Sequence, residues 1–269
     1  MSSKPASLAL VGAGKMGAAL LGGWLGAGIS ARTISVYEPH PSDELKQFAE
    51  QEGFALNAPP APAQTVVLAI KPQMLEAAAP ALTPLFESGS LLISILAGKT
   101  VANLAARLPA SAIVRAMPNT PAAIGRGITG AYASAEVTPA QRETAQRLLS
   151  GVGAVEWVDA EPLIDAVTAI SGSGPAYVFH LVEALAQAGA ALGLPADLAL
   201  RLARATVEGS GELLHRSPET SPETLRRNVT SPGGTTQAAL DVLMGSDGLA
   251  ALMARATAAA EKRAGELSG

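Results

Sequence analysis

The first half of the chain alternates short apolar runs, rich in Val and Ile, with segments of helical pattern. Continuous apolar strands that alternate with helices are typical of a mostly parallel sheet covered on both faces. Strands are predicted at residues 8–11, 33–37, 66–70, 91–95, 113–117, 128–133 and 155–158. Helices are predicted over residues 15–27 and from Pro139 to about residue 150, with Thr138 as the N-cap. Residues 57–64 hold three prolines where a crossover helix would be expected, and therefore predict a loop.

The strand pattern stops after Asp159. The rest of the chain predicts helices over residues 163–170, 176–192, 196–215, 223–229, 235–244 and 249–267. Two domains follow: a doubly wound α/β domain over residues 1–160 and an all-α domain over residues 161–269. The helices are rich in Ala and apolar on more than one face, as in residues 181–192. Because such helices need cover on all sides, we expect the second domain to form a homodimer.

Composition narrows the classes of function. Net charge is −4 and no long basic run occurs, which disfavours a nucleic-acid partner. The chain has no Cys, so disulfides, thiolate catalysis and Cys-based metal sites are excluded, and no metal site is expected. Every long uncharged stretch is broken by Gly or Pro, so no membrane span is expected. These features fit a cytoplasmic protein.

Three glycines, Gly12, Gly14 and Gly17, form a GxGxxG pattern with Lys15 and Met16 between the last two. The pattern follows a predicted strand and opens a predicted helix, which is the context that a dinucleotide-binding turn requires. The alternative is a glycine-rich turn without a ligand. The context favours a Rossmann-type domain that binds the pyrophosphate at the helix N-terminus.

Glu38 ends the second predicted strand, 38 − 17 = 21 positions after the last glycine. An acid at this position accepts hydrogen bonds from the adenosine ribose and disfavours a 2′-phosphate, so Glu38 argues for NADH. The alternative is a solvated loop residue. His40, Ser42 and Lys46 lie nearby in the sequence and could serve a phosphate.

Two further segments follow predicted strands at the edge where open α/β sheets bind ligands: Lys71 with Pro72, and residues 117–120. We expect cofactor or substrate contacts there, although proline also simply ends a strand. Residues 171–175, SGSGP, interrupt a helical region. That break predicts either a kink or a close approach to a ligand, and the sequence does not decide between them.

Residues 231–236, SPGGTT, immediately precede a predicted helix. Free backbone N–H groups at a helix start make an anion site, for which we expect Gly234, Thr235 and Thr236 as donors. The alternative is ordinary capping by Thr. None of the three histidines lies in a triad or metal pattern, and His180 is expected in the core. A hydride transfer here would therefore lack a histidine acid, which favours a substrate that already accepts hydride readily.

Taken together, GAGKMG, LAIKP, RAMPNTP, SGSGPAY and SPGGTT resemble the pyrroline-5-carboxylate reductase family over nearly the whole chain. The resemblance implies reduction of 1-pyrroline-5-carboxylate to L-proline by NADPH or NADH, the last step of proline biosynthesis. It also implies a Rossmann domain and a helical domain that interlocks with a partner chain in a homodimer. In some members five dimers form a decamer.

The resemblance also assigns roles to residues. The cofactor would be held by Gly12, Gly14, Lys15, Met16, Gly17, Glu38, Asn57, Ala69, Ile70, Lys71, Pro72, Met117, Pro118, Asn119 and Thr120. The substrate would be bound by Ser231, Gly233, Gly234, Thr235 and Thr236, with Thr236 as the catalytic residue near the ring nitrogen. The chain departs from the family pattern in three places: Glu38 replaces a small polar residue, the loop after Asn57 is shortened, and Arg227 replaces an acidic residue.

Two other functions fit parts of the pattern. An enzyme of the β-hydroxyacid dehydrogenase type has a similar two-domain plan, but it needs a Lys on the first interdomain helix, and residues 163–182 contain none. A non-catalytic NAD(P)-binding regulator would use the glycine turn and the helical half. The SPGGTT segment would then have no purpose.

Overall fold

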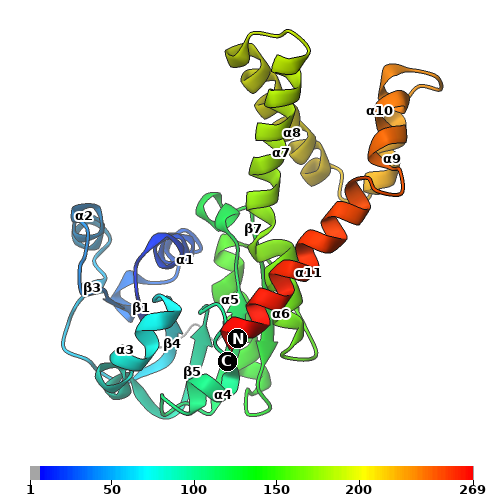
Figure 1. Ribbon diagram of the computed structural model, residues 1–269. Helices are drawn as coiled ribbons and strands as arrows, with labels where there is room; N and C mark the ends of the chain where they lie inside the picture. The colour runs from blue at the N-terminus through cyan, green and yellow to red at the C-terminus, as the bar shows by residue number, and fades with distance from the viewer. Residues whose placement is uncertain (1–6, 269) are drawn as a thin grey trace. The chain divides into compact units, whose positions relative to one another are not determined.

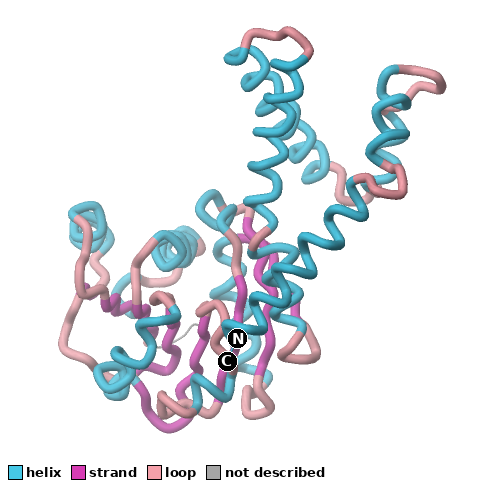
Figure 2. The backbone as a smooth tube through the Cα atoms, in the orientation of Figure 1, coloured by secondary structure: helices cyan, strands magenta, loops and turns pink. Residues whose placement is uncertain are grey.

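The computed structural model describes residues 7–268 and divides into two compact units. Unit 1 comprises Met1–Gly172 together with Ala260–Gly269, and unit 2 comprises Ser173–Ala259. Figure 2 shows that the strands gather in unit 1, whereas unit 2 is built from helices (Figures 1 and 2).

Unit 1 is built on an eight-stranded sheet with the order β3-β2-β1-β4-β5-β6-β7-β8. All neighbouring strands are parallel except β6 and β7. The strands are β1 (Leu8–Val11), β2 (Ile34–Tyr37), β3 (Ala55–Leu56), β4 (Ala63–Leu68), β5 (Phe86–Ser94), β6 (Ala112–Met117), β7 (Gly127–Ala133) and β8 (Gly153–Trp157). The doubly wound α/β fold predicted from the sequence is confirmed.

The antiparallel pair β6 and β7 follows from the length of its connection. Only residues 118–126 separate the two strands, whereas a parallel crossover needs a dozen or more residues. The connection contains a short 3₁₀ turn, η4 (Thr120–Ile124), which ends at Gly125 with φ 69°. The chain therefore reverses direction, and the next strand runs against its neighbour.

Helices cover both faces of the sheet. On one face lie α1 (Lys15–Gly26), α2 (Asp43–Glu52) and α5 (Pro139–Leu149), and on the other lie α3 (Leu75–Leu82) and α4 (Val101–Ala105). Each face of the sheet has its own hydrophobic core, and successive side chains of β1 alternate between them. Leu8 and Leu10 lie in the first core, and Ala9 and Val11 lie in the second. Short 3₁₀ segments occur at η1 (Ala31–Thr33), η2 (Pro72–Met74), η3 (Thr83–Leu85) and η5 (Ser150–Val152).

Two segments of unit 1, around Thr138 and after Asn57, carry local signals in the sequence. Helix α5 begins at Pro139 with Thr138 as its N-cap, and the Thr138 hydroxyl accepts the N–H of Gln141, as predicted. The proline segment after Asn57 contains no helix, also as predicted, but β4 begins at Ala63, inside the range expected to be a loop. The two-residue strand β3 was not predicted, because a pair of residues carries no periodic signal.

A buried ion cluster joins β6 to residues 161–165. Arg115 of β6 is only 3% exposed, and its guanidinium contacts Asp165 Oδ1 at 2.9 Å and Glu161 Oε1 at 3.4 Å. Glu161 Oε1 also accepts the N–H of Val101, at the start of α4. Asp165 belongs to α6 (Leu163–Val167), which continues into a π-helical turn, η6 (Thr168–Gly172).

Unit 2 is helical, as the sequence predicts. Its helices are α7 (Gly174–Ala191), α8 (Ala196–Arg216), α9 (Pro222–Asn228), α10 (Thr235–Leu243) and most of α11 (Leu249–Ser268). Helices α7, α9 and α10 bury no residue within the single chain. Large apolar side chains are exposed instead, including Phe179 at 63% and Val242 at 75%. Exposed apolar surface of this extent marks a site of association.

No helix within residues 7–268 combines the length and the apolar character that crossing a bilayer requires.

Candidate functional site

The reversal of strand order in unit 1 lies at β1, which pairs with β2 on one side and β4 on the other. Open α/β sheets bind ligands outside the carboxyl ends of the strands at such a switch point. The parallel strands bring their carboxyl ends to one edge. That edge carries the glycine turn after β1, Glu38 after β2, Asn57 after β3, residues 69–72 after β4 and residues 118–120 after β6.

The three glycines of the turn have three different environments. Gly12 has φ 91°, and a Cβ there would lie 2.7 Å from the carbonyl oxygen of Ala69. A Cβ on Gly17 would lie 2.2 Å from the carbonyl oxygen of Gly12. A Cβ on Gly14 would meet no heavy atom within 4 Å. Gly12 and Gly17 are thus required by the packing of the protein itself, whereas Gly14 borders open space that a ligand can fill.

The N-terminus of α1 is suited to an anion. Gly14 is its N-cap and therefore provides no capping side chain, and the first turn contains no acidic residue. Lys15 is exposed and Met16 is half-buried. The helix dipole and the N–H groups of the first turn therefore favour a negatively charged group, such as a pyrophosphate. The residues present fit the dinucleotide that the glycine pattern predicts.

Glu38 lies directly over the glycine turn. Its Oε2 accepts the N–H of Ala13 at 3.0 Å, and its Oε1 accepts the N–H of His40 at 3.2 Å. Asn57 holds the backbone of Glu38 from the other side, since Asn57 Oδ1 accepts the Glu38 N–H at 2.9 Å and Asn57 Nδ2 donates to the Glu38 carbonyl at 2.8 Å. The structure therefore brings together two residues that the sequence placed in the cofactor site, and it does not support a freely solvated Glu38.

The segment after β4 forms one wall of the glycine turn. The N–H of Ala69 donates to the carbonyl of Val11 at 2.7 Å, and Ile70 lines a pocket with Glu38. Lys71 is exposed, and Pro72 begins η2. Because β4 already ends at Leu68, Pro72 does not terminate the strand, which removes the alternative explanation for this proline.

The segment after β6 has a structural role that the sequence did not reveal. Pro118 and Asn119 are buried, and Asn119 Oδ1 accepts the N–H of Ile128 at 3.0 Å. Asn119 therefore fixes the beginning of β7. Met117 ends β6, and Thr120 is exposed at the start of η4.

The SGSGP segment is a π-helical turn followed by the start of α7. The side chain of Ser171 donates to the carbonyl of Val167 at 3.0 Å, inside the preceding turn. A Cβ on Gly172 would lie 2.7 Å from Cε of Met117. The kink thus has a local cause, and the glycine permits close packing against Met117.

The SPGGTT segment lies in unit 2. Gly233 has φ 71°, and Gly234 is the N-cap of α10, with no side-chain hydrogen bond at the cap and no acid in the first turn. Ordinary capping by Thr235 or Thr236 is therefore not observed. The N–H of Gly234 donates to the carbonyl of Ser231 at 3.0 Å, so this N–H already has a partner within its own turn. The first-turn N–H groups of Thr235 and Thr236 remain as the donors that this helix start offers.

His180 also differs from expectation. It is 77% exposed in the single chain and pairs with Glu183 on the same helix, so it is not a core residue. The apolar residues around His180 are themselves exposed in the single chain, so an apolar neighbourhood in the sequence does not indicate a buried position here. Within the described residues, no group of three or more His, Cys, Asp or Glu side chains could hold a metal ion.

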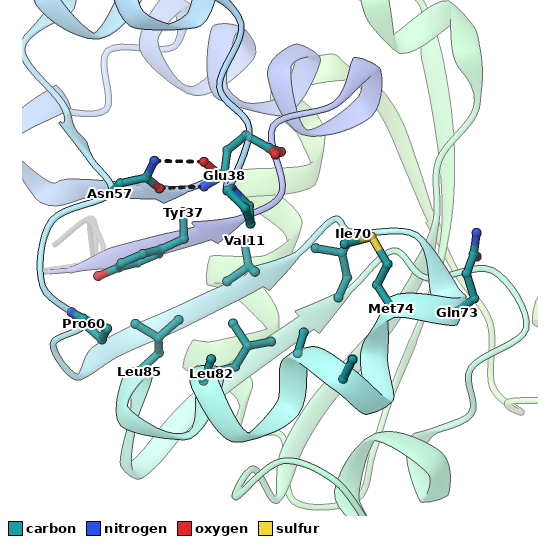
Figure 3. A pocket seen from close by; sticks show the side chains of 14 residues that line it. Val11, Tyr37, Glu38, Asn57, Pro60, Ile70, Gln73, Met74, Leu82 and Leu85 are labelled. Carbon is teal, nitrogen blue, oxygen red and sulfur yellow. Dashed lines mark hydrogen bonds between the residues drawn. The ribbon is translucent and has the colours of Figure 1, made fainter.

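A pocket of about 600 Å³ lies beside the switch point and was not predicted as a unit (Figure 3). Figure 3 shows Glu38 and Asn57 on one side of it, with Leu82 and Leu85 on the opposite side. Tyr37, Gln73 and Met74 also line it, and none of the three was named from the sequence. Tyr37 ends β2, and Gln73 and Met74 follow the end of β4. Position near a strand end is the only sequence signal that could have indicated these three residues.

Comparison with known proteins identifies the family. The pyrroline-5-carboxylate reductase from Pseudomonas aeruginosa is 42% identical over 268 residues, which cover 97% of this chain and 96% of that protein. The chain belongs to the pyrroline-5-carboxylate reductase family. The family model for pyrroline-5-carboxylate reductase dimerisation matches residues 161–267, and a model described as NADP oxidoreductase, coenzyme F420-dependent, matches residues 7–98. The resemblance drawn from the five motifs is confirmed.

Solved structures of pyrroline-5-carboxylate reductases share the fold. The enzyme from Coxiella burnetii superposes with a TM-score of 0.90 at 36% identity, covering 99% of this chain and 100% of that one. The pyrroline carboxylate reductase from Plasmodium falciparum, solved with NADP bound, gives a TM-score of 0.79 at 27% identity, with 99% of each chain covered. Because the dimerisation match covers the helices with exposed apolar side chains, it supports homo-oligomerisation of this chain.

Proposed function

We propose that this chain reduces 1-pyrroline-5-carboxylate to L-proline with NADPH or NADH, as the last step of proline biosynthesis. The observation that carries the proposal is the 42% identity to a pyrroline-5-carboxylate reductase over nearly the full length of both proteins. Each of the two units keeps its own anion-binding helix start, α1 in unit 1 and α10 in unit 2. We assign the dinucleotide to residues 1–160 and the substrate and the dimer interface to residues 161–269.

The cofactor is held at the carboxyl edge of the sheet. The helix start at Gly14 receives the pyrophosphate, because its open side lets a ligand approach the backbone. Nicotinamide, when bound, supplies the hydride. The proposed cofactor-binding residues are Gly12, Gly14, Lys15, Met16, Gly17, Glu38, Asn57, Ala69, Ile70, Lys71, Pro72, Met117, Pro118, Asn119 and Thr120.

The substrate carboxylate binds at the start of α10. The SPGGTT segment contains no Lys or Arg, so the donors are backbone N–H groups, chiefly those of Thr235 and Thr236. Ser231 and Gly233 shape the turn, and Gly234 leaves the cap free of a side chain. The helix dipole adds to the attraction of the anion.

The reaction requires the protein mainly to position the substrate against the cofactor. The imine carbon of the substrate is electrophilic, and it becomes Cδ of proline when it receives the hydride. Thr236 is the proposed catalytic residue, whose hydroxyl would hydrogen-bond to the ring nitrogen. A hydroxyl is too weak an acid to supply the proton, so the substrate is reduced as its protonated iminium form, with the proton taken from solvent, and the hydroxyl orients the ring. Correct orientation of two reactants can supply several kcal/mol of the barrier.

The proposed assembly is a homodimer formed through unit 2, with a decamer of five dimers as the larger state. The proposed setting is the cytoplasm, with a small-molecule substrate and neither nucleic acid nor membrane as partner. The net charge of −4 supports the absence of a nucleic-acid partner.

The test is an absorbance assay at the reduced-nicotinamide band with 1-pyrroline-5-carboxylate, run once with NADH and once with NADPH. The proposal expects loss of absorbance that depends on substrate, with one L-proline formed for each cofactor oxidised. Tight cofactor binding without turnover in either reaction would contradict it and favour a non-catalytic binding protein.

A further inference from the structure

The pocket beside the glycine turn has an unusual distribution of charge. Among the described residues that line it, Glu38 is the only charged one, and the rest are apolar or neutral, mainly Ala, Leu, Pro and Ile (Figure 3). Sites for a ribose 2′-phosphate use Arg or Lys, because the phosphate carries close to two negative charges. A pocket with one anion and no cation is unsuited to that group.

The Glu38 carboxylate is held by hydrogen bonds from the backbone. Its two oxygens accept the N–H groups of Ala13 and His40 at 3.0 and 3.2 Å. The backbone of Glu38 is held by both polar atoms of the Asn57 side chain, Oδ1 and Nδ2. Asn57 itself has φ 52° and donates its backbone N–H to the carbonyl of Val36 at 2.8 Å. To admit a phosphate over the glycine turn, the carboxylate would have to break these contacts.

The basic residues that follow Glu38 do not compensate for its charge. Lys46 Nζ lies 2.8 Å from Asp43 Oδ1, and this contact holds the pKa of Asp43 below its usual range. His40 uses its backbone N–H to bind the Glu38 carboxylate, and its side chain does not line the pocket. Neither residue is positioned as a phosphate ligand.

The short connection between β3 and β4 adds to the same site. Residues 57–62 include three prolines and form no helix, and Pro60 of this segment lines the apolar side of the pocket together with Tyr37, Leu82 and Leu85. Apolar and aromatic walls of this kind suit a purine ring, with the adjoining ribose at Glu38. The charge at the ribose position then decides which dinucleotide fits.

We propose that this protein selects NADH over NADPH, and that Glu38 is the residue responsible. The inference rests on the proposed function for the identity of the cofactor, and it narrows that cofactor to one member of the pair. The ribose hydroxyls of NADH donate to the Glu38 carboxylate, whereas the 2′-phosphate of NADPH meets a fixed negative charge. A preference for NADH of at least about tenfold is expected, equivalent to about 1.4 kcal/mol.

The test compares three proteins in two assays. Dissociation constants for NADH and NADPH are measured by nicotinamide fluorescence without substrate, and kcat/KM is measured for each cofactor with 1-pyrroline-5-carboxylate. The wild type is compared with Glu38→Gln, which keeps the size of the side chain and an oxygen that can accept the Ala13 N–H. Glu44→Gln is the control, because it removes the same charge from an exposed position that does not line the pocket.

The wild type and Glu44→Gln are expected to favour NADH at least about tenfold, and Glu38→Gln to lower that ratio about tenfold in both assays. Equal or tighter binding of NADPH by the wild type would overturn the inference, as would an unchanged ratio in Glu38→Gln. The binding assay uses no substrate. An absence of turnover would therefore contradict the proposed reaction alone, and the selectivity for NADH would still be decided.

Discussion

A Cβ placed on Gly17 would lie 2.2 Å from the carbonyl oxygen of Gly12, so these two glycines touch backbone to backbone where β1 turns into α1. Real Cβ atoms do not approach an oxygen so closely, and the obstacle is main chain that cannot rotate away. Gly14, between them, faces open space. One motif therefore contains glycines with two different purposes, packing of the fold and access for the cofactor.

The first prediction separates those purposes. Gly17→Ala is expected to destabilise the protein strongly, because α1 would have to move away from the turn. Gly14→Ala is expected to fold with a melting temperature near that of the wild type and to bind NADH at least about tenfold more weakly, because its methyl group occupies the ligand's space. Thermal unfolding and cofactor titration measure the two effects. Loss of stability in Gly14→Ala with unchanged affinity would refute the assignment.

The second prediction concerns the buried cluster around Arg115. Arg115→Met removes the buried guanidinium that contacts both Glu161 and Asp165, and removal of one partner from a buried ion pair costs about 3–5 kcal/mol. The control is Arg107→Met, which breaks an exposed contact with Glu76 and is expected to cost about 0–1 kcal/mol. Urea unfolding at one fixed protein concentration measures both values. Equal costs in the two variants would show that the buried cluster contributes no more than a surface pair.

The third prediction concerns the substrate loop. Thr236→Ala removes one hydrogen bond to the substrate, worth roughly 1–3 kcal/mol of transition-state stabilisation, and is expected to lower kcat/KM about ten- to a hundredfold. Cofactor affinity is expected to stay nearly unchanged. Gly234→Val is expected to lower kcat/KM further, because its branched side chain fills the anion's place. Even a Cβ alone at this position would lie 3.1 Å from the carbonyl oxygen of Ser231.

The control for that experiment is Thr144→Ala on α5 in unit 1. Thr144 loses a comparable hydroxyl contact, to the carbonyl of Ala140 at 2.9 Å, at a position outside both proposed binding segments. It is expected to retain wild-type kinetics. Full turnover by Thr236→Ala, or an effect of that variant mainly on cofactor binding, would rule out the proposed role of the hydroxyl.

The fourth prediction concerns assembly. The chain is expected to be at least a dimer at micromolar concentration, because the helices of unit 2 expose apolar side chains that need a partner. Phe179→Glu introduces a charge at a residue that is 63% exposed in the single chain and is expected to dissociate or destabilise the dimer. Phe179→Leu keeps the position apolar and is expected to leave the assembly intact. Light scattering that shows a monodisperse monomeric wild type would contradict this prediction.

Most of the fold was predictable because its signals are local. The apolar runs of β1, β5 and β6 and the cap at Thr138 depend on neighbouring residues, and the helices of unit 2 are long Ala-rich segments without a strand pattern. The helices α2, α3 and α4, the antiparallel direction of β7 and the brief strand β3 were not predicted. The direction of β7 depends on the length of a loop and β3 depends on pairing with β2, and neither is visible in periodicity.

The site was predictable only as far as motifs reach. The sequence pattern located the glycine turn and Glu38, but the two hydrogen bonds between Glu38 and Asn57 join residues 19 positions apart. The partners of Arg115 lie 46 and 50 positions away. The use of the Gly234 N–H within its own turn is set by backbone geometry, which residue types alone do not specify.

The most direct test of the proposed reaction follows the hydride itself. NADH in which deuterium replaces both hydrogens on C4 of the nicotinamide is incubated with 1-pyrroline-5-carboxylate and the enzyme. The product is analysed by mass spectrometry and NMR. The account predicts L-proline that carries one deuterium, located at Cδ, with none acquired there when unlabelled NADH is used in D₂O. Proline without deuterium at Cδ, or no proline at all while NADH is bound, would contradict it.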